Sequence, residues 1–215
     1  MATRLSEGER ITYKVPVIRR PFGTPRKRAC VLWTRKFLTI QSEDMMGGLY
    51  FSVEGHFATG DEPVSDAWIA ENLRQALQTS RMIARTAPPP GETINELEQR
   101  SRARYAAYAE DLRKRYGYRT VDSAFAQALQ VSVTLYEDLL VLRAMNRRRG
   151  GIWVAWEKGF AGRRGTSKHI LCEPEGKYLR LSPSCSDEEL ARGGREMLRA
   201  SRISGKPVYV EPEGA

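Results

Sequence analysis

The sequence predicts an α+β fold, in which a largely antiparallel sheet is packed by several helices. Apolar residues recur at helical spacing after Ser65, Thr93 and Ser186, three residues of the kind that cap helix N-termini. At 131–142, apolar and polar residues alternate as they do in half-buried strands. The predicted strands of this segment are joined by a connection too short for a crossover helix, which indicates antiparallel pairing.

The first predicted strands lie in the N-terminal part of the chain. Residues 31–40 form a run of β-branched and aromatic residues typical of a strand. Residues 41–48 contain acidic residues and a glycine pair, so we expect a turn there, and 49–53 form a second strand. The segment is therefore predicted to be a hairpin with a long acidic connection.

Two helices follow this hairpin. The first begins at Ser65 and must end before the proline triplet at 88–90, because proline cannot continue a helix. The second opens with Thr93 and Glu96, a capping-box pair in which each side chain can satisfy a backbone N–H group at the other end of the turn. Gly117 is placed to end it.

The rest of the chain returns to short elements. They are a short helix at 121–129, a tight hairpin of 131–136 and 140–142, a loop at 147–151, a strand at 152–156, a basic loop at 159–165, a strand at 178–181 and a last helix from Ser186.

An internal duplication is suggested by two of the predicted helices. Residues 65–81 and 186–202 are identical at seven of seventeen positions, at a constant offset of 121 and without a gap. Each helix follows a short predicted strand, at 49–53 and at 178–181. Shared capping and core chemistry can produce part of this likeness, but the ungapped match favours a duplicated strand–helix unit within one domain.

The chain is long enough to bury a sizeable core, and we divide it into two parts. Residues 1–30 contain three prolines among basic residues and are predicted to be an extended lead-in, whereas 31–215 form a single α+β domain. The first ten residues lack the apolar stretch of a signal peptide, and the apolar runs are too short to cross a membrane, so we expect neither a signal peptide nor a membrane span. The three cysteines have no framework spacing, so we expect reduced thiols and a cytoplasmic protein.

The net charge of +9 is unevenly distributed along the chain. Residues 1–36 carry ten basic and two acidic side chains, 37–98 carry three and ten, and 99–170 carry fifteen and six. This alternation argues against one uniform phosphate-binding face. Basic clusters at 26–28, 113–115 and 147–149, with aromatic residues nearby, keep a nucleic-acid-binding module as the alternative function.

The residues needed for catalysis or metal binding do not form a recognisable set. The two histidines, His56 and His169, lack a specified orienting group, although His169 with Ser167 and Cys172 leaves an unrecognised enzyme as a weaker alternative. No paired metal-ligand spacing and no phosphate-binding glycine motif occurs. We therefore expect a binding protein, with no enzymatic activity, no metal and no cofactor.

The sequence resembles the CdiI family, the immunity proteins of contact-dependent growth inhibition (CDI) systems. Two stretches of sequence carry this resemblance, together with the order in which they precede the last helix. They are FLTIQSEDMMGGLYFS at 37–52 and RYGYRT at 115–120, followed by a helix, a hairpin and the closing SDEELARGGREMLRASR. The resemblance spans Val31 to Ser201, and the basic N-terminus and the 147–165 segment depart from it. It implies a cytoplasmic protein that binds and blocks the C-terminal domain of a cognate CDI toxin, often a nuclease, through a surface that varies between relatives.

If the toxin is a nuclease, a positive substrate cleft would favour carboxylates on the inhibitor, because complementary charge speeds association. The acidic block supplies the predicted toxin-binding residues, which are Glu43, Asp44, Glu54, Asp61 and Glu62. An acidic toxin would instead be bound by a basic interface of Arg147, Arg148, Arg149, Arg163 and Arg164. The acidic block is favoured, and binding to nucleic acid or to a membrane is not expected.

Overall fold

A computed structural model describes residues 23–147, 153–155, 178–203, 206 and 208–210 of the chain. They form one sheet in the order β3-β2-β1-β5-β6-β7, in which β4 also pairs with β2, and β8 and β9 with β6. The strands are β1 (Lys27–Trp33), β2 (Phe37–Met45), β3 (Leu49–Phe51), β4 (Phe57–Asp61), β5 (Leu129–Leu135), β6 (Leu140–Arg147), β7 (Trp153–Ala155), β8 (Tyr178–Leu181) and β9 (Arg202–Ile203). All pairs of strands are antiparallel except β6 with β9, so the predicted fold class is confirmed.

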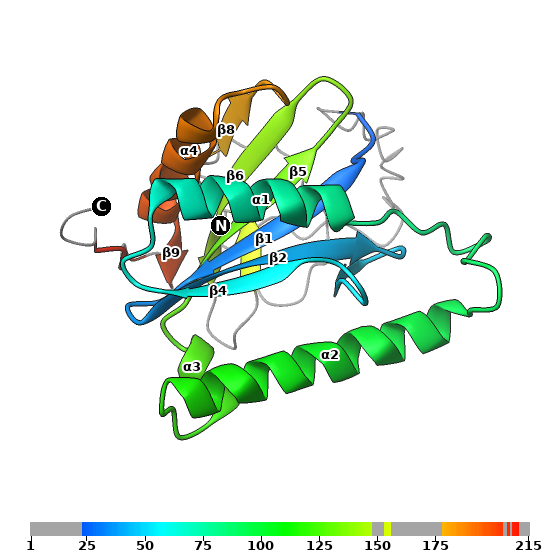
Figure 1. Ribbon diagram of the computed structural model, residues 1–215, viewed down its shortest axis with the longest axis horizontal. Coiled ribbons are helices and arrows are strands. Elements are labelled where there is room, and N and C mark those ends of the chain that lie inside the picture. The colour runs from blue at the N-terminus through cyan, green and yellow to red at the C-terminus, as the bar shows by residue number, and fades with distance from the viewer. Residues whose placement is uncertain (1–22, 148–152, 156–177, 204–205, 207, 211–215) are drawn as a thin grey trace, which may run out of the picture.

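In the described part of the chain, four helices cover the two faces of the sheet (Figure 1). They are α1 (Asp66–Thr79), α2 (Ile94–Arg115), α3 (Val121–Phe125) and α4 (Asp187–Ala200). Helices α1 and α4 lie side by side over one face, where alternate residues of β1, β2, β5 and β6 form the main apolar core. The opposite face carries α2 and α3 over a smaller core that includes Cys30, Phe37, Phe51, Tyr108 and Leu112.

The predicted helix starts are confirmed at three positions. Ser65, Thr93 and Ser186 are the N-cap residues of α1, α2 and α4, and the capping box of Thr93 and Glu96 is present. Gly117, with φ of +66°, follows the end of α2 as predicted. The predicted helix at 121–129 is shorter, because α3 ends at Phe125 and β5 already begins at Leu129.

The predicted turn at 41–48 is too long, because strand β2 continues to Met45 and only 46–48 turn the chain into β3. The first hairpin turns earlier, where the Thr34 N–H donates to the Phe37 carbonyl and the Phe37 N–H donates to the Thr34 hydroxyl. Neither glycine nor proline marks this turn, so the apolar run of 31–40 conceals it. Strand β1 also begins at Lys27, so the last residues of the predicted lead-in belong to the sheet.

The strands predicted in the second half of the chain are present in the structure. The strand at 178–181 is confirmed as β8, the strand at 152–156 is represented by β7, and the hairpin of 131–142 is β5 with β6. The loop of 159–165 and residues 1–22 of the lead-in lie outside the described residues.

The strand registers support an internal duplication larger than the one predicted. Val31 pairs with Ile40 in β1–β2, and the residues 102 positions later, Val133 and Leu142, pair in β5–β6. The long strands β2 and β6 each pair with a short strand at one end and with a second at the other, β3 and β4 or β7 and β8. The strand that precedes α1 is thus β4, rather than the predicted 49–53, and it is the counterpart of β8.

The contacts between α1 and α4 follow the same two-fold relation. Arg74 of α1 donates to the Asp187 carboxylate and to the backbone carbonyl of Cys185, at the start of α4. Arg195 of α4 donates to Asp66 and to the carbonyl of Val64, at the start of α1. The shared aspartate and arginine of the two matching segments therefore form a reciprocal pair of contacts across the internal axis.

The shared serine at the end of each helix joins two strands. Ser80 Oγ accepts from the backbone N–H of Arg28 and donates to the carbonyl of Glu43, at 2.9 and 2.7 Å. Ser201 Oγ accepts from the N–H of Met145 at 3.3 Å and donates to the carbonyl of Gln130 at 2.8 Å. Both serines have no exposed surface.

We expect Ser80→Ala and Ser201→Ala each to lower the free energy of unfolding by about 1–2 kcal/mol, because each leaves buried backbone groups without a partner. Urea denaturation of the two variants measures this loss. Ser184→Ala, in an exposed turn, is the control and should change stability by less than about 0.5 kcal/mol. Equal stabilities of Ser80→Ala, Ser201→Ala and the parent protein would contradict the bridging role.

Candidate partner-binding site

The two carboxylates predicted to lead the acidic interface are buried in β2. Glu43 is 9% exposed and Asp44 is not exposed at all, so the exposed loop expected for them is wrong. Their side chains point to opposite faces of the sheet, because successive residues of a strand alternate. Glu43 pairs with Arg28 at 3.2 Å on the face that carries α2.

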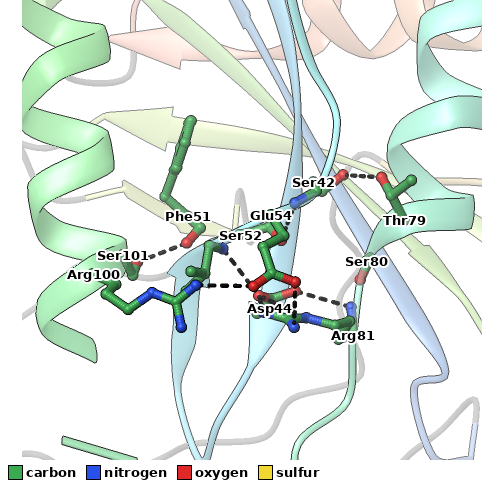
Figure 2. Close-up of polar contacts among 12 residues, drawn as sticks. Ser42, Asp44, Phe51, Ser52, Glu54, Thr79, Ser80, Arg81, Arg100 and Ser101 are labelled. Carbon is green, nitrogen blue, oxygen red and sulfur yellow. Dashed lines mark hydrogen bonds and ion pairs between the residues drawn. The ribbon is translucent and has the colours of Figure 1, made fainter. Parts of the chain in front are cut away.

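Asp44 is the centre of a polar network between β2 and the segment after α1 (Figure 2). Its carboxylate accepts from the backbone N–H groups of Val53 and Arg81, at 3.1 and 3.0 Å. The Arg81 guanidinium donates to the same carboxylate at 3.0 Å. Because these donors occupy both oxygens of Asp44, this residue fixes the ends of β2 and α1 in place.

Glu54 is the exposed member of this network. Its side chain is 60% exposed and bridges Arg81 and Arg100, at 3.2 and 2.9 Å. The backbone around it is held firmly, since Arg104 donates to the carbonyls of Ser52 and Gly55. Glu54 is therefore presented to solvent from a rigid bend between β3 and β4, beside α2.

Asp61 and Glu62 lie at the far end of β4. Asp61 is 67% exposed in its side chain and pairs with Arg115 at 3.1 Å. A hydrogen bond from Tyr116 is the main cause that lowers the pKa of Asp61, and the Arg115 charge adds to it. Burial raises the pKa of Glu62, although its carboxylate accepts from the backbone N–H of Val64.

The charge blocks that are separate in sequence are therefore mixed in space. Arg100 and Arg115 of α2 pair with Glu54 and Asp61 of the acidic block, and Arg28 of the basic N-terminal block pairs with Glu43. This pairing neutralises much of the field that an acidic patch would need to attract a positive partner. Of the five predicted carboxylates, the structure links only Asp44 and Glu54, through Arg81. Glu43 lies on the opposite face of β2 with Arg28, and Asp61 and Glu62 lie elsewhere.

Glu43 gives a pH dependence with a definite sign. Burial raises the pKa of its carboxyl above the ordinary value, even with Arg28 beside it. The folded state thus binds this proton more tightly than the unfolded chain, and stability falls as pH rises from the ordinary glutamate pKa through the raised one. Glu43→Gln lacks this loss.

We therefore expect the stability of Glu43→Gln relative to the parent protein to increase across that pH interval and then to level off. Urea denaturation at a series of pH values from 4 to 8 measures it, with Glu54→Gln as the exposed control. A stability difference that does not change with pH would show that Glu43 titrates normally.

The alternative basic interface is described only in part. Arg147 ends β6, whereas Arg148, Arg149, Arg163 and Arg164 lie outside the described residues. Two other basic clusters are engaged within the molecule. Arg26 pairs with Glu137, and Arg113 forms two hydrogen bonds with Glu110.

The histidines considered for catalysis or metal binding are the next candidates. His56 Nε2 lies 2.8 Å from the Asn72 amide oxygen, at the start of β4. His169 lies outside the described residues. In the described ranges, histidine, cysteine and acidic side chains form no group of three that could hold a metal ion. None of the helices placed by the structure is long and apolar enough to cross a membrane.

A surface groove between β3 and α2 is the feature that sequence reasoning missed. Its volume is about 260 Å³, and it is lined by residues of β2, β3 and α2. Leu49 and Tyr105, on its two sides, are 50% and 39% exposed. Tyr105 occupies the same helical stripe of α2 as Leu97, Tyr108 and Leu112, a pattern that by itself predicts packing in the core rather than an exposed ring.

The architecture defines the class of protein as a single-sheet α+β protein with helices on both faces. It resembles a protein of unknown function from Neisseria meningitidis, with a TM-score of 0.65 and 18% identity over 82% of this chain and 95% of that one. A CdiA-CT/CdiI toxin and immunity complex from Yersinia pseudotuberculosis matches with a TM-score of 0.62 and 19% identity, over 81% of this chain and 97% of that one.

The family model for the CDI immunity protein, CdiI, matches residues 27–167. This segment is more than half of the chain, and it begins at the first residue of β1. The chain belongs to the CdiI family, so the predicted resemblance is confirmed. A comparison with curated proteins found no match.

Proposed function

We propose that this protein binds and neutralises the C-terminal toxin domain of a cognate CDI system, and that this toxin is a nuclease. The observation that carries the proposal is the CDI immunity family match, which spans both halves of the central sheet. The similarity of the fold to a chain in a toxin and immunity complex supports it. The protein would act in the cytoplasm, where nucleic acid is the target to be protected, and by occupancy rather than by catalysis.

We propose the surface around α2 and β4 as the side that faces the toxin. Glu54 and Asp61 both border this surface and are exposed, and each is held in place by arginines. A carboxylate in a fixed position can bind a cation of a partner without a large loss of side-chain entropy. Glu43 and Asp44 then support the surface from within the sheet, because their side chains are buried.

The experiment is to co-express the protein with the toxin domain encoded directly upstream, and to purify the complex. We expect a stable complex and loss of toxin activity that is complete at a fixed stoichiometric ratio. Neutralisation by much less than one protein per toxin would indicate an enzyme instead. No complex, together with salt-sensitive binding to DNA or RNA, would contradict the proposal and favour the nucleic-acid alternative.

A further inference from the structure

The segment RYGYRT, at 115–120, begins at the end of α2 and is fixed there by a helix cap. The N–H of Gly117 donates to the Lys114 carbonyl at 3.3 Å. The N–H of Tyr118 donates to the Arg113 carbonyl at 2.9 Å. These two bonds form a Schellman motif, in which the residue after the helix takes a left-handed conformation, as Gly117 does with φ of +66°. The cap therefore gives the two tyrosines of the segment defined positions beside the sheet.

Both tyrosine rings of this segment lie against Phe37 of β2. The Tyr116 ring stacks on the Phe37 ring with centroids 4.6 Å apart, and the Tyr118 ring meets it edge to face at 6.4 Å. Lys36 Nζ donates to the backbone carbonyl of Tyr116 at 2.8 Å and lies 4.7 Å from the centroid of the Tyr118 ring. Since Phe37 has no exposed surface, Tyr116 is fixed to the core through its ring and to the first hairpin turn through its backbone.

The stacking on Phe37 brings the Tyr116 hydroxyl to Asp61 at the end of β4. Phe37 and Asp61 are directly opposite each other in the β2–β4 pair, so their side chains lie on the same face of the sheet. The Tyr116 hydroxyl donates to Asp61 Oδ1 at 2.5 Å. The chain after Asp61 is also held, because the N–H of Glu62 donates to the Lys36 carbonyl at 3.1 Å. The backbone and the side chain of Asp61 therefore both have fixed positions.

The Asp61 carboxylate keeps capacity for a further donor. Arg115 donates to both of its oxygens, at 3.1 and 3.2 Å, and Oδ1 also accepts from Tyr116. An ionised carboxylate has about four lone-pair sites on its two oxygens, so Oδ2 retains one. The side chain is 67% exposed. Because a tyrosine hydroxyl is neutral, Tyr116 sets the direction of this carboxylate without cancelling its charge.

We propose that Tyr116 is a positioning residue of the toxin-binding surface, and that it orients the Asp61 carboxylate for a lysine or arginine of the toxin. The partner and the surface rest on the proposed function. A carboxylate that is already held in one direction loses less side-chain entropy on binding than a free one does. Tyr116 acts through its hydroxyl alone, since phenylalanine would keep the ring contact with Phe37.

The contact is tested without the toxin, by NMR titration of the side-chain carboxyl carbons. The Tyr116 hydroxyl is the main cause that lowers the pKa of Asp61. We expect Tyr116→Phe to raise this pKa towards the ordinary aspartate value, because the ionised carboxylate loses a donor. Tyr118→Phe is the matched control and should leave the pKa of Asp61 unchanged, since the Tyr118 hydroxyl forms no hydrogen bond with the residues that the structure describes. The same Asp61 pKa in Tyr116→Phe and in the parent protein would overturn the assignment.

The role of Tyr116 in the complex is tested by a double-mutant cycle on toxin affinity, measured by calorimetry. We expect Asp61→Asn to weaken binding about tenfold and Tyr116→Phe about fivefold. The variant with both changes should bind about tenfold more weakly than the parent protein, because Tyr116 acts only through Asp61. A loss of about fiftyfold, the product of the two single effects, would show that Tyr116 acts independently of Asp61.

The possible outcomes separate this proposal from the proposed function. Tyr118→Phe should keep the parental affinity in the same assay. Unchanged affinity of Asp61→Asn, or independent effects of the two changes, would overturn the proposal and leave the immunity function standing. Failure of the parent protein to bind the toxin would instead refute the proposed function, and the titration would still judge the contact between Tyr116 and Asp61.

Discussion

Replacing Asp44 by alanine lowers the free energy of unfolding by about 3–4 kcal/mol, the largest loss we expect from a single polar substitution in this protein. The carboxylate has no exposed surface, and it is the acceptor for two backbone N–H groups and for the Arg81 guanidinium. Removing it leaves the partly buried charge of Arg81 and the N–H of Val53 uncompensated. Urea denaturation at pH 7 measures the loss.

Glu54→Gln is the matched control for this result. Glu54 also pairs with Arg81, but its side chain is 60% exposed, so we expect a loss below about 1 kcal/mol. The two variants also separate stability from binding. Asp44→Ala that remains folded should keep its toxin affinity, because a buried side chain makes no contact with a partner. A large loss of affinity without a loss of stability would return Asp44 to the interface.

The second large effect is expected at Arg195. This arginine is 5% exposed, and it donates to Asp66 and to the carbonyl of Val64, both at 2.6 Å. Replacing it by alanine leaves a carbonyl without its partner and removes the packing of the arginine stem between α4 and α1. We expect a loss of about 3 kcal/mol in the free energy of unfolding.

Arg74 provides the control, because it makes the equivalent contacts on the other side of the internal axis. Its side chain is 39% exposed and its partner Asp187 is 64% exposed. Water therefore screens this pair, and Arg74→Ala should cost at most about 1 kcal/mol. Equal losses for Arg74→Ala and Arg195→Ala would show that geometry, rather than burial, decides the strength of these contacts.

Much of the fold could be predicted because its signals are local. A capping serine or threonine and a helical stripe are read within one turn, and they located the starts of α1, α2 and α4. The first hairpin was misread because Thr34–Lys36 form a turn without glycine or proline. The pair Gly47 and Gly48 does lie in a turn, but this turn joins β2 to β3 and is the second turn of the sheet rather than the first.

The site was harder to predict because its determinants come from distant parts of the chain. Glu43 and Asp44 look like exposed loop residues in the sequence, because the strand that contains them extends past the predicted end at residue 40 to Met45. Their partners Arg28 and Arg81 are 15 and 37 positions away in the sequence. The groove needs β3 to lie against α2, some fifty residues later in the sequence. The family resemblance gave the class of partner, but it carried no information on either contact.

The two-fold relation within the chain has a consequence for the number of partners. Two identical subunits related in this way would offer every surface twice, and a ligand of one would find a second site on the other. Here the halves are fused, and α2 is inserted between them, so among the described elements it has no counterpart after α4. The core of the chain therefore repeats as the core of a symmetric dimer would, but α2 occurs once among the described elements. A partner-binding surface built on α2 then accommodates one partner per molecule.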